Sequence, residues 1–224
     1  MKKRTKLAQR SLPDYTRGEE IMNMVTHIVG GSLGILILIS CLLKAAHKEN
    51  IMGIISSSIY GGCMVILYTV SSIYHGLYPS TGKKVMQIID HCTIYFLIAG
   101  TYTPILLSAF IPVYPVLAWV IFALQWALCF TAATLTAIDL KKYNVFSMVC
   151  YIAMGWCIIL FIPQTIRVVT RAGFYLLLSG GLAYTAGAVL YGIGSKKRWF
   201  HCVFHIFVVA GSFLQYLTII FYVL

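Results

Sequence analysis

The sequence predicts an all-α membrane protein built as a bundle of seven transmembrane helices, and three observations support this. Of 224 residues, 60% are hydrophobic and only 10% are charged, whereas soluble domains are about one quarter charged. The mean hydropathy is +0.86. Seven apolar runs have the length of roughly 20 residues that a helix needs to cross a bilayer. This composition excludes a cytosolic globular enzyme, a disordered chain and a disulfide scaffold.

The seven spans follow one another with short connections. They are predicted at Ile21–Leu43, Ile51–Tyr74, Val85–Phe110, Val116–Ile138, Val145–Ile162, Phe174–Ile193 and Phe200–Leu224. The first is too long for the apolar region of a signal peptide and lacks a cleavage site, so it is predicted to stay as an anchor. Glycine and proline inside the spans, such as Pro104 and Gly155, are tolerated in membrane helices. We therefore expect a basic tail, residues 1–20, and one bundle, residues 21–224.

Lysine and arginine orient the predicted bundle. Thirteen of them lie in the tail and in the second, fourth and sixth connections: Lys2, Lys3, Arg4, Lys6, Arg10, Arg17, Lys83, Lys84, Lys141, Lys142, Lys196, Lys197 and Arg198. The other four lie in the first and fifth connections: Lys44, Lys48, Arg167 and Arg171. The positive-inside rule then predicts a cytoplasmic N-terminus and an outside C-terminus in the cell membrane. The net charge of +11 is explained as a topology signal, and no nucleic-acid partner is expected.

Ionisable residues at membrane depth are costly and mark functional sites by default. His75 ends the second span, Asp90 and His91 lie near the start of the third, and His201 and His205 begin the seventh. The predicted topology places all five at the cytoplasmic end of the bundle, where the first span contributes Glu20, Asn23 and His27. Solvated surface positions are expected for the remaining acidic residues and one histidine: Asp14, Glu19, His47, Glu49 and Asp139.

The spacing of the histidines indicates a metal site. His201 and His205 are four residues apart, so both imidazoles project from one helix face. His75, four residues after Ser71, adds a third imidazole at the same depth. Three neutral histidines leave a tetrahedral Zn²⁺ with one open position for water, whose pKa the metal lowers towards about 7. Imidazole also suits copper, iron and nickel, so zinc is the expectation and the identity of the metal stays open.

Two further residues are candidates for catalysis. Asp90 could accept a proton from the water, hold it by a hydrogen bond, or bind the metal directly. Ser71 could hydrogen-bond the water or a substrate carbonyl, or only its own helix backbone. His91 points elsewhere on the helix from Asp90, and a packing role is expected for it.

Glu20, Asn23 and His27 form one stripe of the first span because they are three and four residues apart. Three roles stay open for them. We expect first a polar clamp between helices, next a second shell around the metal ligands, and also consider a proton path.

These residues carry a pattern that resembles the haemolysin III family, which is grouped with the progestin and adipoQ receptors and more distantly with the alkaline ceramidases. The pattern covers the whole chain: Glu20-x-x-Asn23-x-x-Thr26-His27, Ser71-x-x-x-His75, Asp90-His91, Ala99-Gly100-Thr101-Tyr102-Thr103-Pro104 and His201-x-x-x-His205. The resemblance implies a zinc ion held by His75, His201 and His205, with Asp90 and Ser71 alongside. It also implies a bacterial type of member, because the chain lacks the soluble extension of the animal receptors.

Two functions follow as hypotheses. In the ceramidases and adiponectin receptors a comparable centre is associated with hydrolysis of lipid amides, which implies an intramembrane hydrolase of a lipid amide or ester that contributes to membrane-lipid homeostasis. Bacterial members are named for lysis of red cells, which implies instead a cytolysin, or a membrane sensor in which zinc is structural. The sequence leaves open which of the two is correct, which lipid is the substrate and what the oligomeric state is.

Overall fold

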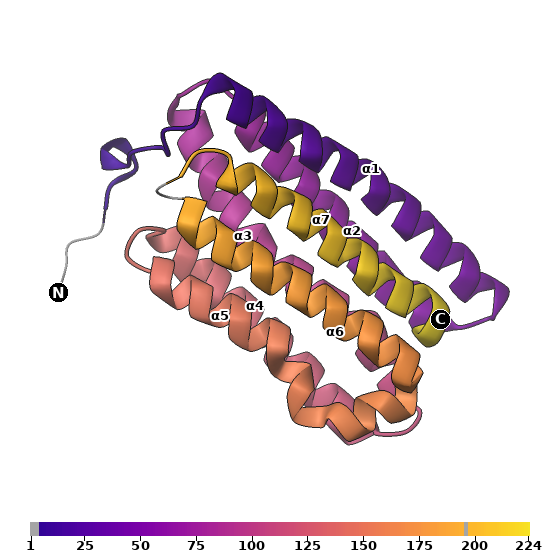
Figure 1. The fold of residues 1–224 in the computed structure, drawn as a ribbon. Coiled ribbons are helices and arrows are strands. Elements are labelled where there is room, and N and C mark those ends of the chain that lie inside the picture. The colour runs from indigo at the N-terminus through magenta and orange to yellow at the C-terminus, as the bar shows by residue number, and fades with distance from the viewer. Residues whose placement is uncertain (1–4, 195–196) are drawn as a thin grey trace.

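The computed structural model describes residues 5–194 and 197–224, and within them the chain forms a bundle of seven α-helices (Figure 1). The helices are α1 (Arg17–His47), α2 (Ile51–Gly76), α3 (Thr81–Pro104), α4 (Pro115–Ile138), α5 (Asn144–Trp156), α6 (Ile162–Gly194) and α7 (Phe200–Thr218). Short 3₁₀ and π-helical turns extend α5, α3 and α7 at Cys157–Phe161, Ile105–Phe110 and Ile219–Val223. The predicted all-α class is confirmed.

Local sequence explains where several helices begin. The Thr16 hydroxyl accepts a hydrogen bond from the backbone N–H of Glu19, whose carboxylate accepts the Thr16 N–H in return, which is a capping box. The side chains of Asn50 and Ser80 cap α2 and α3 by accepting a hydrogen bond from the backbone N–H of Gly53 and of Lys83. Pro115 opens α4 at a position where its missing N–H costs no hydrogen bond. Helix α1 therefore starts four residues before the predicted Ile21.

Six helical stretches of the described residues are long and apolar enough to cross a membrane. Five correspond to single predicted spans. The sixth runs from Asn144 to Ile193, over 50 residues, and combines the predicted spans Val145–Ile162 and Phe174–Ile193. Its backbone leaves the helical conformation at Thr170, where φ is 65°, and Figure 1 shows α6 returning alongside α5.

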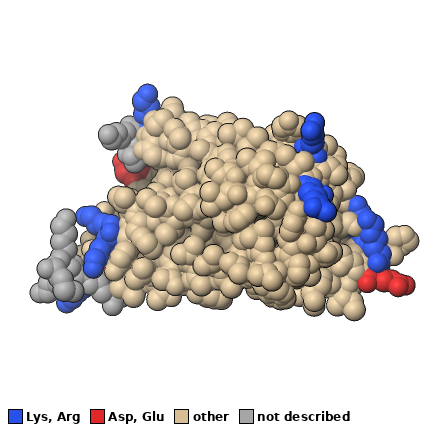
Figure 2. All heavy atoms as spheres, turned by 90° about the horizontal axis from the view of Figure 1, so that it is seen from below, with Lys and Arg blue, Asp and Glu red and all other residues tan. Residues whose placement is uncertain are grey.

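The outer surface of the bundle is apolar, as contact with lipid requires. Large hydrophobic side chains are exposed along the helices, among them Leu36, Leu43, Leu124, Leu160 and Val189. On the face shown in Figure 2, lysine and arginine gather towards the two ends and leave the middle uncharged. The surface and the six apolar stretches together indicate a multi-pass membrane protein.

Helices α1 and α2 pack closely because glycine removes side chains from their contact. A Cβ atom on Gly30 would lie 2.7 Å from the ring of Tyr68, and one on Gly61 would lie 2.6 Å from Leu38 Cβ. Glycine therefore lets the two backbones approach. This packing holds Tyr68 against the face of α1 that carries the predicted polar stripe.

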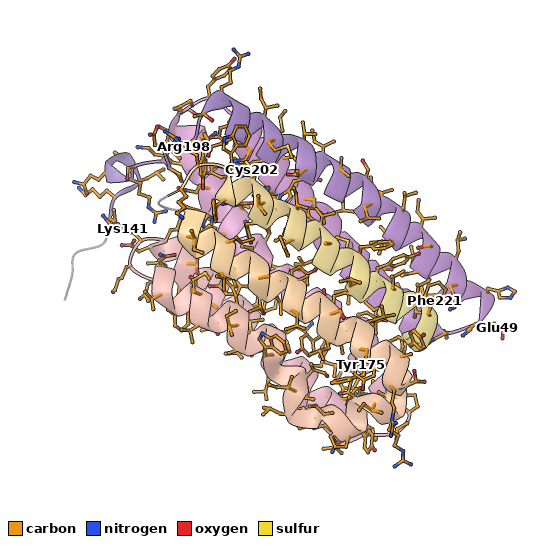
Figure 3. The ribbon with its side chains drawn as sticks, viewed as in Figure 1. Glu49, Lys141, Tyr175, Arg198, Cys202 and Phe221 are labelled. Carbon is orange, nitrogen blue, oxygen red and sulfur yellow. The ribbon has the colours of Figure 1, made fainter. Side chains whose placement is uncertain are left out.

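Contacts between distant residues bring the predicted polar groups to one end of the bundle, here called the histidine end. Glu20 of α1 bonds His75 at the end of α2 and Lys83 at the start of α3. Glu19 bonds the backbone of Trp199 just before α7. Figure 3 shows Arg198 and Cys202 at this end, with Glu49 and Phe221 at the other.

Two predictions about acidic residues were wrong. Glu19 and Asp139 were expected at the solvated surface, but they are 2% and 1% exposed. Each is buried by a contact with a segment far away in the sequence: Glu19 with Trp199, and Asp139 with the backbone N–H of Thr5 at 2.7 Å. Of the charges used to orient the bundle, Lys2, Lys3, Arg4 and Lys196 lie outside the described residues.

Candidate metal centre

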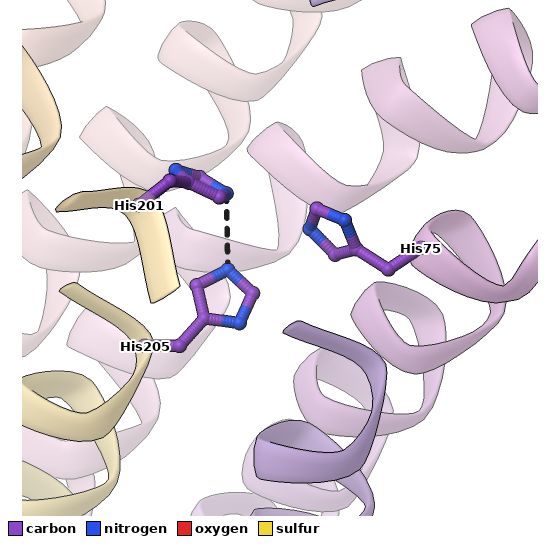
Figure 4. A group of neighbouring side chains, drawn as sticks. All are labelled: His75, His201 and His205. Atoms are coloured by element: carbon purple, nitrogen blue, oxygen red, sulfur yellow. Dashed lines mark hydrogen bonds between the residues drawn. The ribbon is translucent and has the colours of Figure 1, made fainter. Parts of the chain in front are cut away.

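Three histidines from two helices converge at the histidine end. His75 lies in the last turn of α2, and His201 and His205 lie one turn apart at the start of α7. One ligand nitrogen from each lies within 4.8 Å of those of the other two, and Figure 4 shows the three rings facing one another. All three side chains are buried. The predicted convergence of these imidazoles is therefore confirmed.

Hydrogen bonds donated by Nδ1 show which ring nitrogen of His75 and of His205 carries the lone pair. His75 Nδ1 donates to Glu20 Oε2 at 2.6 Å, and His205 Nδ1 donates to the backbone carbonyl of Asn23 at 3.3 Å. A neutral imidazole that donates from Nδ1 carries its lone pair on Nε2. His75 Nε2 is buried and has no hydrogen-bond partner among the described residues. His205 Nε2 faces His201 Nε2 at 3.1 Å.

These atoms fit a zinc ion. Two imidazole nitrogens bound to one tetrahedral zinc at 2.0–2.1 Å lie about 3.3 Å apart, close to the 3.1 Å between the Nε2 atoms of His201 and His205. A buried lone pair such as that of His75 Nε2 needs a partner, which a cation supplies. Three imidazoles are also a ligand set of catalytic zinc sites. The group could therefore hold a metal ion.

Glu20 fixes the orientation of His75, one of the three candidate ligands. Its Oε2 atom accepts the hydrogen bond from His75, and its Oε1 atom lies 2.6 Å from Lys83 Nζ. Lys83, which the sequence placed among the surface charges, is buried and also donates to the Leu77 carbonyl at 2.8 Å. A carboxylate behind a ligating histidine fixes the ring orientation and raises its basicity, and the lysine balances the carboxylate charge.

The other two residues of the predicted stripe also face the cluster. Asn23 Nδ2 lies 3.5 Å from His75 Nδ1, and the Asn23 carbonyl accepts the bond from His205. The His27 ring stacks on His205 with centroids 3.7 Å apart and planes at 12°. It also makes a T-shaped contact with the Tyr68 ring, with centroids 5.0 Å apart. The stripe thus contacts two of the three histidines through hydrogen bonds and ring stacking.

Asp90 and Ser71 line the same cavity as His201 and His205. Among the described residues, the ligand group contains the three histidines and does not include Asp90. The Asp90 carboxylate lies 3.7 Å from His91 Nδ1. Among the described residues, Asp90 therefore shares the cavity with His201 and His205 but lies outside the group that could hold a metal.

His91 ties α3 to its neighbours. Its Nδ1 atom donates to the Gln87 carbonyl at 2.8 Å, and its own carbonyl accepts the Tyr151 hydroxyl at 2.7 Å. Gln87 lies in α3 and Tyr151 in α5, so the second of these bonds connects two helices.

A cavity of about 190 Å³ extends from the cluster into the bundle. Its polar end is lined by His27, Ser71, Asp90, His201 and His205. Apolar side chains from five helices and from the turns after α3 and α5 line much of the rest, among them Leu97, Ile98, Ile158, Leu177 and Val208. Two of the three histidines, His201 and His205, therefore stand at the polar end of a largely apolar space.

The cavity reaches the outer surface between α5 and α6. Ile152, Gly155 and Ile159 line the cavity and are also exposed. Leu178 and Gly181 of α6 line it from the opposite side, and neither glycine narrows the gap with a side chain. The exposed side chains near these residues, such as Val149 and Leu160, are apolar.

Sequence reasoning missed two residues beside the cluster. The ring of Tyr15 stacks on His201, with centroids 4.9 Å apart and planes at 18°. Burial raises the pKa of Tyr15, and Tyr191, Glu20 and Asp90 raise it further, so its phenol is protonated at neutral pH. Glu19 holds the backbone just before His201. A tyrosine and a glutamate beside a basic tail give no signal in the sequence, because both contacts depend on how the starts of α1 and α7 meet.

The fold and the site define a class: a multi-pass α-helical membrane protein with three buried histidines grouped at one end. A family model described as Haemolysin-III related matches residues 15–216. The chain therefore belongs to the haemolysin III family, as its motifs indicated. The matched residues include the whole cluster and its contacts from α1.

Individual relatives agree with this assignment. The chain is 35% identical to Hemolysin-3 of Bacillus cereus over 92% of each chain. It is 34% identical to the Hemolysin-3 homolog of Bacillus subtilis (strain 168), over 93% of this chain and 96% of the relative. It is also 27% identical to the human Monocyte to macrophage differentiation factor, over 74% of this chain and 69% of the relative.

Proposed function

We propose that this protein is a zinc-dependent hydrolase of a lipid amide or ester that contributes to membrane-lipid homeostasis. The observation that carries the proposal is the group of three buried histidines, two of which, His201 and His205, line the polar end of a largely apolar cavity whose wall includes exposed residues of α5. An acyl chain that entered between α5 and α6 would bury its apolar surface there and bring its amide or ester bond to the histidines.

The residues of the site have separable roles in this reaction. His75, His201 and His205 would hold the ion, which supplies activation of water and polarisation of a carbonyl at neutral pH. Asp90 accepts the proton of the attacking water and passes it to the leaving nitrogen or oxygen as the bond to the carbonyl carbon breaks. Ser71 donates a hydrogen bond to the substrate carbonyl, and Glu20 holds His75.

The proposal includes seven crossings of the cell membrane with the N-terminus in the cytoplasm. The 50-residue stretch from Asn144 to Ile193 is more than twice the roughly 20 residues of one crossing, and it turns back on itself. The excess of lysine and arginine at the histidine end favours the cytoplasmic side for it. Lys141→Cys and Arg167→Cys, each made in a variant whose native cysteines have been replaced, test this orientation. Labelling of intact cells should modify position 167 alone, and labelling of position 141 would reverse the orientation.

The enzymatic proposal is tested with purified protein in lipid nanodiscs. Zinc-loaded protein, incubated with ceramides, acyl amides and phospholipids, should release fatty acid from one of these classes, as measured by mass spectrometry. His205→Ala should abolish the release. His47→Ala is the matched control, because His47 is exposed and lies at the opposite end of α1. Equal release by wild type and His205→Ala would reject a role for the cluster in catalysis.

A second candidate is a non-enzymatic cytolysin or sensor in which zinc is structural. It is favoured by the names of two bacterial relatives, Hemolysin-3 and Hemolysin-3 homolog. Leakage of dye from liposomes separates the candidates. Metal-free protein or His205→Ala that still releases dye supports a cytolysin, whereas fatty-acid release without leakage supports the hydrolase.

A further inference from the structure

The N-terminal segment, residues 5–16, lies against the histidine end and is anchored at several points (Figure 1). The Thr5 N–H donates to Asp139 Oδ2 at 2.7 Å, and Lys84 Nζ donates to the Ala8 carbonyl at 3.1 Å. Arg198 bonds both the carbonyl and the carboxylate of Asp14. The anchors come from the α4–α5 connection, the first turn of α3 and the residues just before α7, so the segment spans that end of the bundle.

Tyr15 lies where this segment passes the cluster. Its ring stacks on His201, and its centroid lies 6.0 Å from that of His75. The next residue, Thr16, caps α1, so the backbone on one side of Tyr15 is fixed. On the other side, Asp14 is held by Arg198. Tyr15 is therefore held over two of the three histidines.

The start of α7 is held by the same region. Glu19 Oε1 accepts the N–H of Trp199 at 2.7 Å, and Glu19 Oε2 lies 3.2 Å from Arg198 Nη1. Trp199 has a φ of 67°, a left-handed conformation that costs energy for a bulky residue and that the Glu19 bond stabilises. His201 follows two residues later. Glu19 therefore positions the backbone that carries His201, and Tyr15 positions the His201 ring by stacking on its face.

We infer that Tyr15 is a positioning residue of the metal centre, and that the N-terminal segment covers the centre and limits exchange of its ion with the aqueous phase. The inference rests on the metal site of the proposed function. The stacked ring holds the His201 imidazole in the orientation that faces His205 and His75. It also occupies the approach to the cluster from the end of the bundle where the segment lies.

The test measures how fast zinc leaves the full-length protein. Purified protein loaded with zinc in detergent is mixed with excess 4-(2-pyridylazo)resorcinol, and absorbance reports transfer of zinc to this chelator. Loss of one aromatic contact corresponds to about a two- to twelve-fold change, so Tyr15→Ala should release zinc faster by that factor or more. Tyr15→Phe keeps the stacked ring and should release zinc at the wild-type rate. Tyr78→Ala is the control at the same end, because Tyr78 is 84% exposed.

The outcomes separate this inference from the proposed metal site. If wild type holds one zinc per chain and Tyr15→Ala releases it at the wild-type rate, the inference is wrong and the metal site stands. If wild type holds no zinc, both are wrong. Should Tyr15→Ala fail to fold, Arg198→Ala replaces it, because it removes the anchor on Asp14. Faster release from that variant supports the inference, and an unchanged rate contradicts it.

Discussion

The contact between Glu20 and His75 makes the most informative prediction. Glu20→Gln keeps the size of the side chain but replaces a carboxylate that accepts from His75 and from Lys83, both at 2.6 Å. Loss of a carboxylate behind a metal-ligating histidine costs about 10- to 100-fold in metal affinity. We therefore expect zinc to bind that much more weakly, as measured by competition with a chelator of known affinity.

The same substitution has a separate effect on stability. Removing one partner of a buried ion pair costs about 3–5 kcal/mol. Because Lys83 keeps its bond to the Leu77 carbonyl and the glutamine oxygen can accept another, we expect a smaller loss of about 1–3 kcal/mol. Adding Lys83→Met removes the unpaired ammonium. The double variant should regain most of the stability while its zinc affinity stays low.

Two results would refute this reasoning. Unchanged zinc affinity in Glu20→Gln would show that the carboxylate does not position His75. Full recovery of affinity in the double variant would show that Glu20 acts only by neutralising Lys83. Glu49→Gln is the control, because Glu49 is exposed and lies at the other end of the bundle (Figure 3).

Three further predictions follow from other parts of the structure. Burial raises the pKa of Asp139, but hydrogen bonds and a nearby arginine outweigh burial and lower it. The N-terminal segment should therefore be protected from proteolysis above the unfolded pKa of about 3.9 and should lose that protection as the pH falls through the lower folded pKa. Asp139→Asn should lose the protection even at neutral pH. Gly30→Ala should lower the free energy of unfolding by about 1–3 kcal/mol, because the new Cβ would lie 2.7 Å from the Tyr68 ring. Gly62→Ala is the control: a Cβ on Gly62 would meet no atom within 4 Å, so its thermal midpoint should be unchanged. Gly155→Phe should narrow the opening between α5 and α6 and reduce lipid hydrolysis without loss of bound zinc; undiminished hydrolysis would place the substrate entrance elsewhere.

Much of the fold follows from hydropathy, because a helix in lipid must be apolar over its full length. The predicted spans match the observed helices closely, and the connection between α5 and α6 is the exception. There the chain stays helical from Ile162 to the break at Thr170, although Gln164 and Arg167 interrupt the apolar run. Helical hydrogen bonds satisfy the backbone whether or not the side chains are apolar, so hydropathy does not mark where a membrane helix ends.

The sequence predicts those site residues whose side-chain types are rare inside membranes. His75, His201 and His205 stand out because ionisable groups are costly at that depth. Glu19 and Glu20 are adjacent in sequence, yet one holds the start of α7 and the other holds His75. Their different partners depend on how four helix ends meet, which no local pattern encodes. The same reason hides the role of Tyr15.

The central claim is that three imidazoles from α2 and α7 hold one metal ion. The direct measurement is elemental analysis of purified wild type beside His75→Ala, His201→Ala, His205→Ala and His47→Ala. We expect one zinc per chain in wild type and in His47→Ala, and a loss of zinc in each of the other three variants. Wild type without stoichiometric metal, or equal zinc in all five proteins, would contradict it.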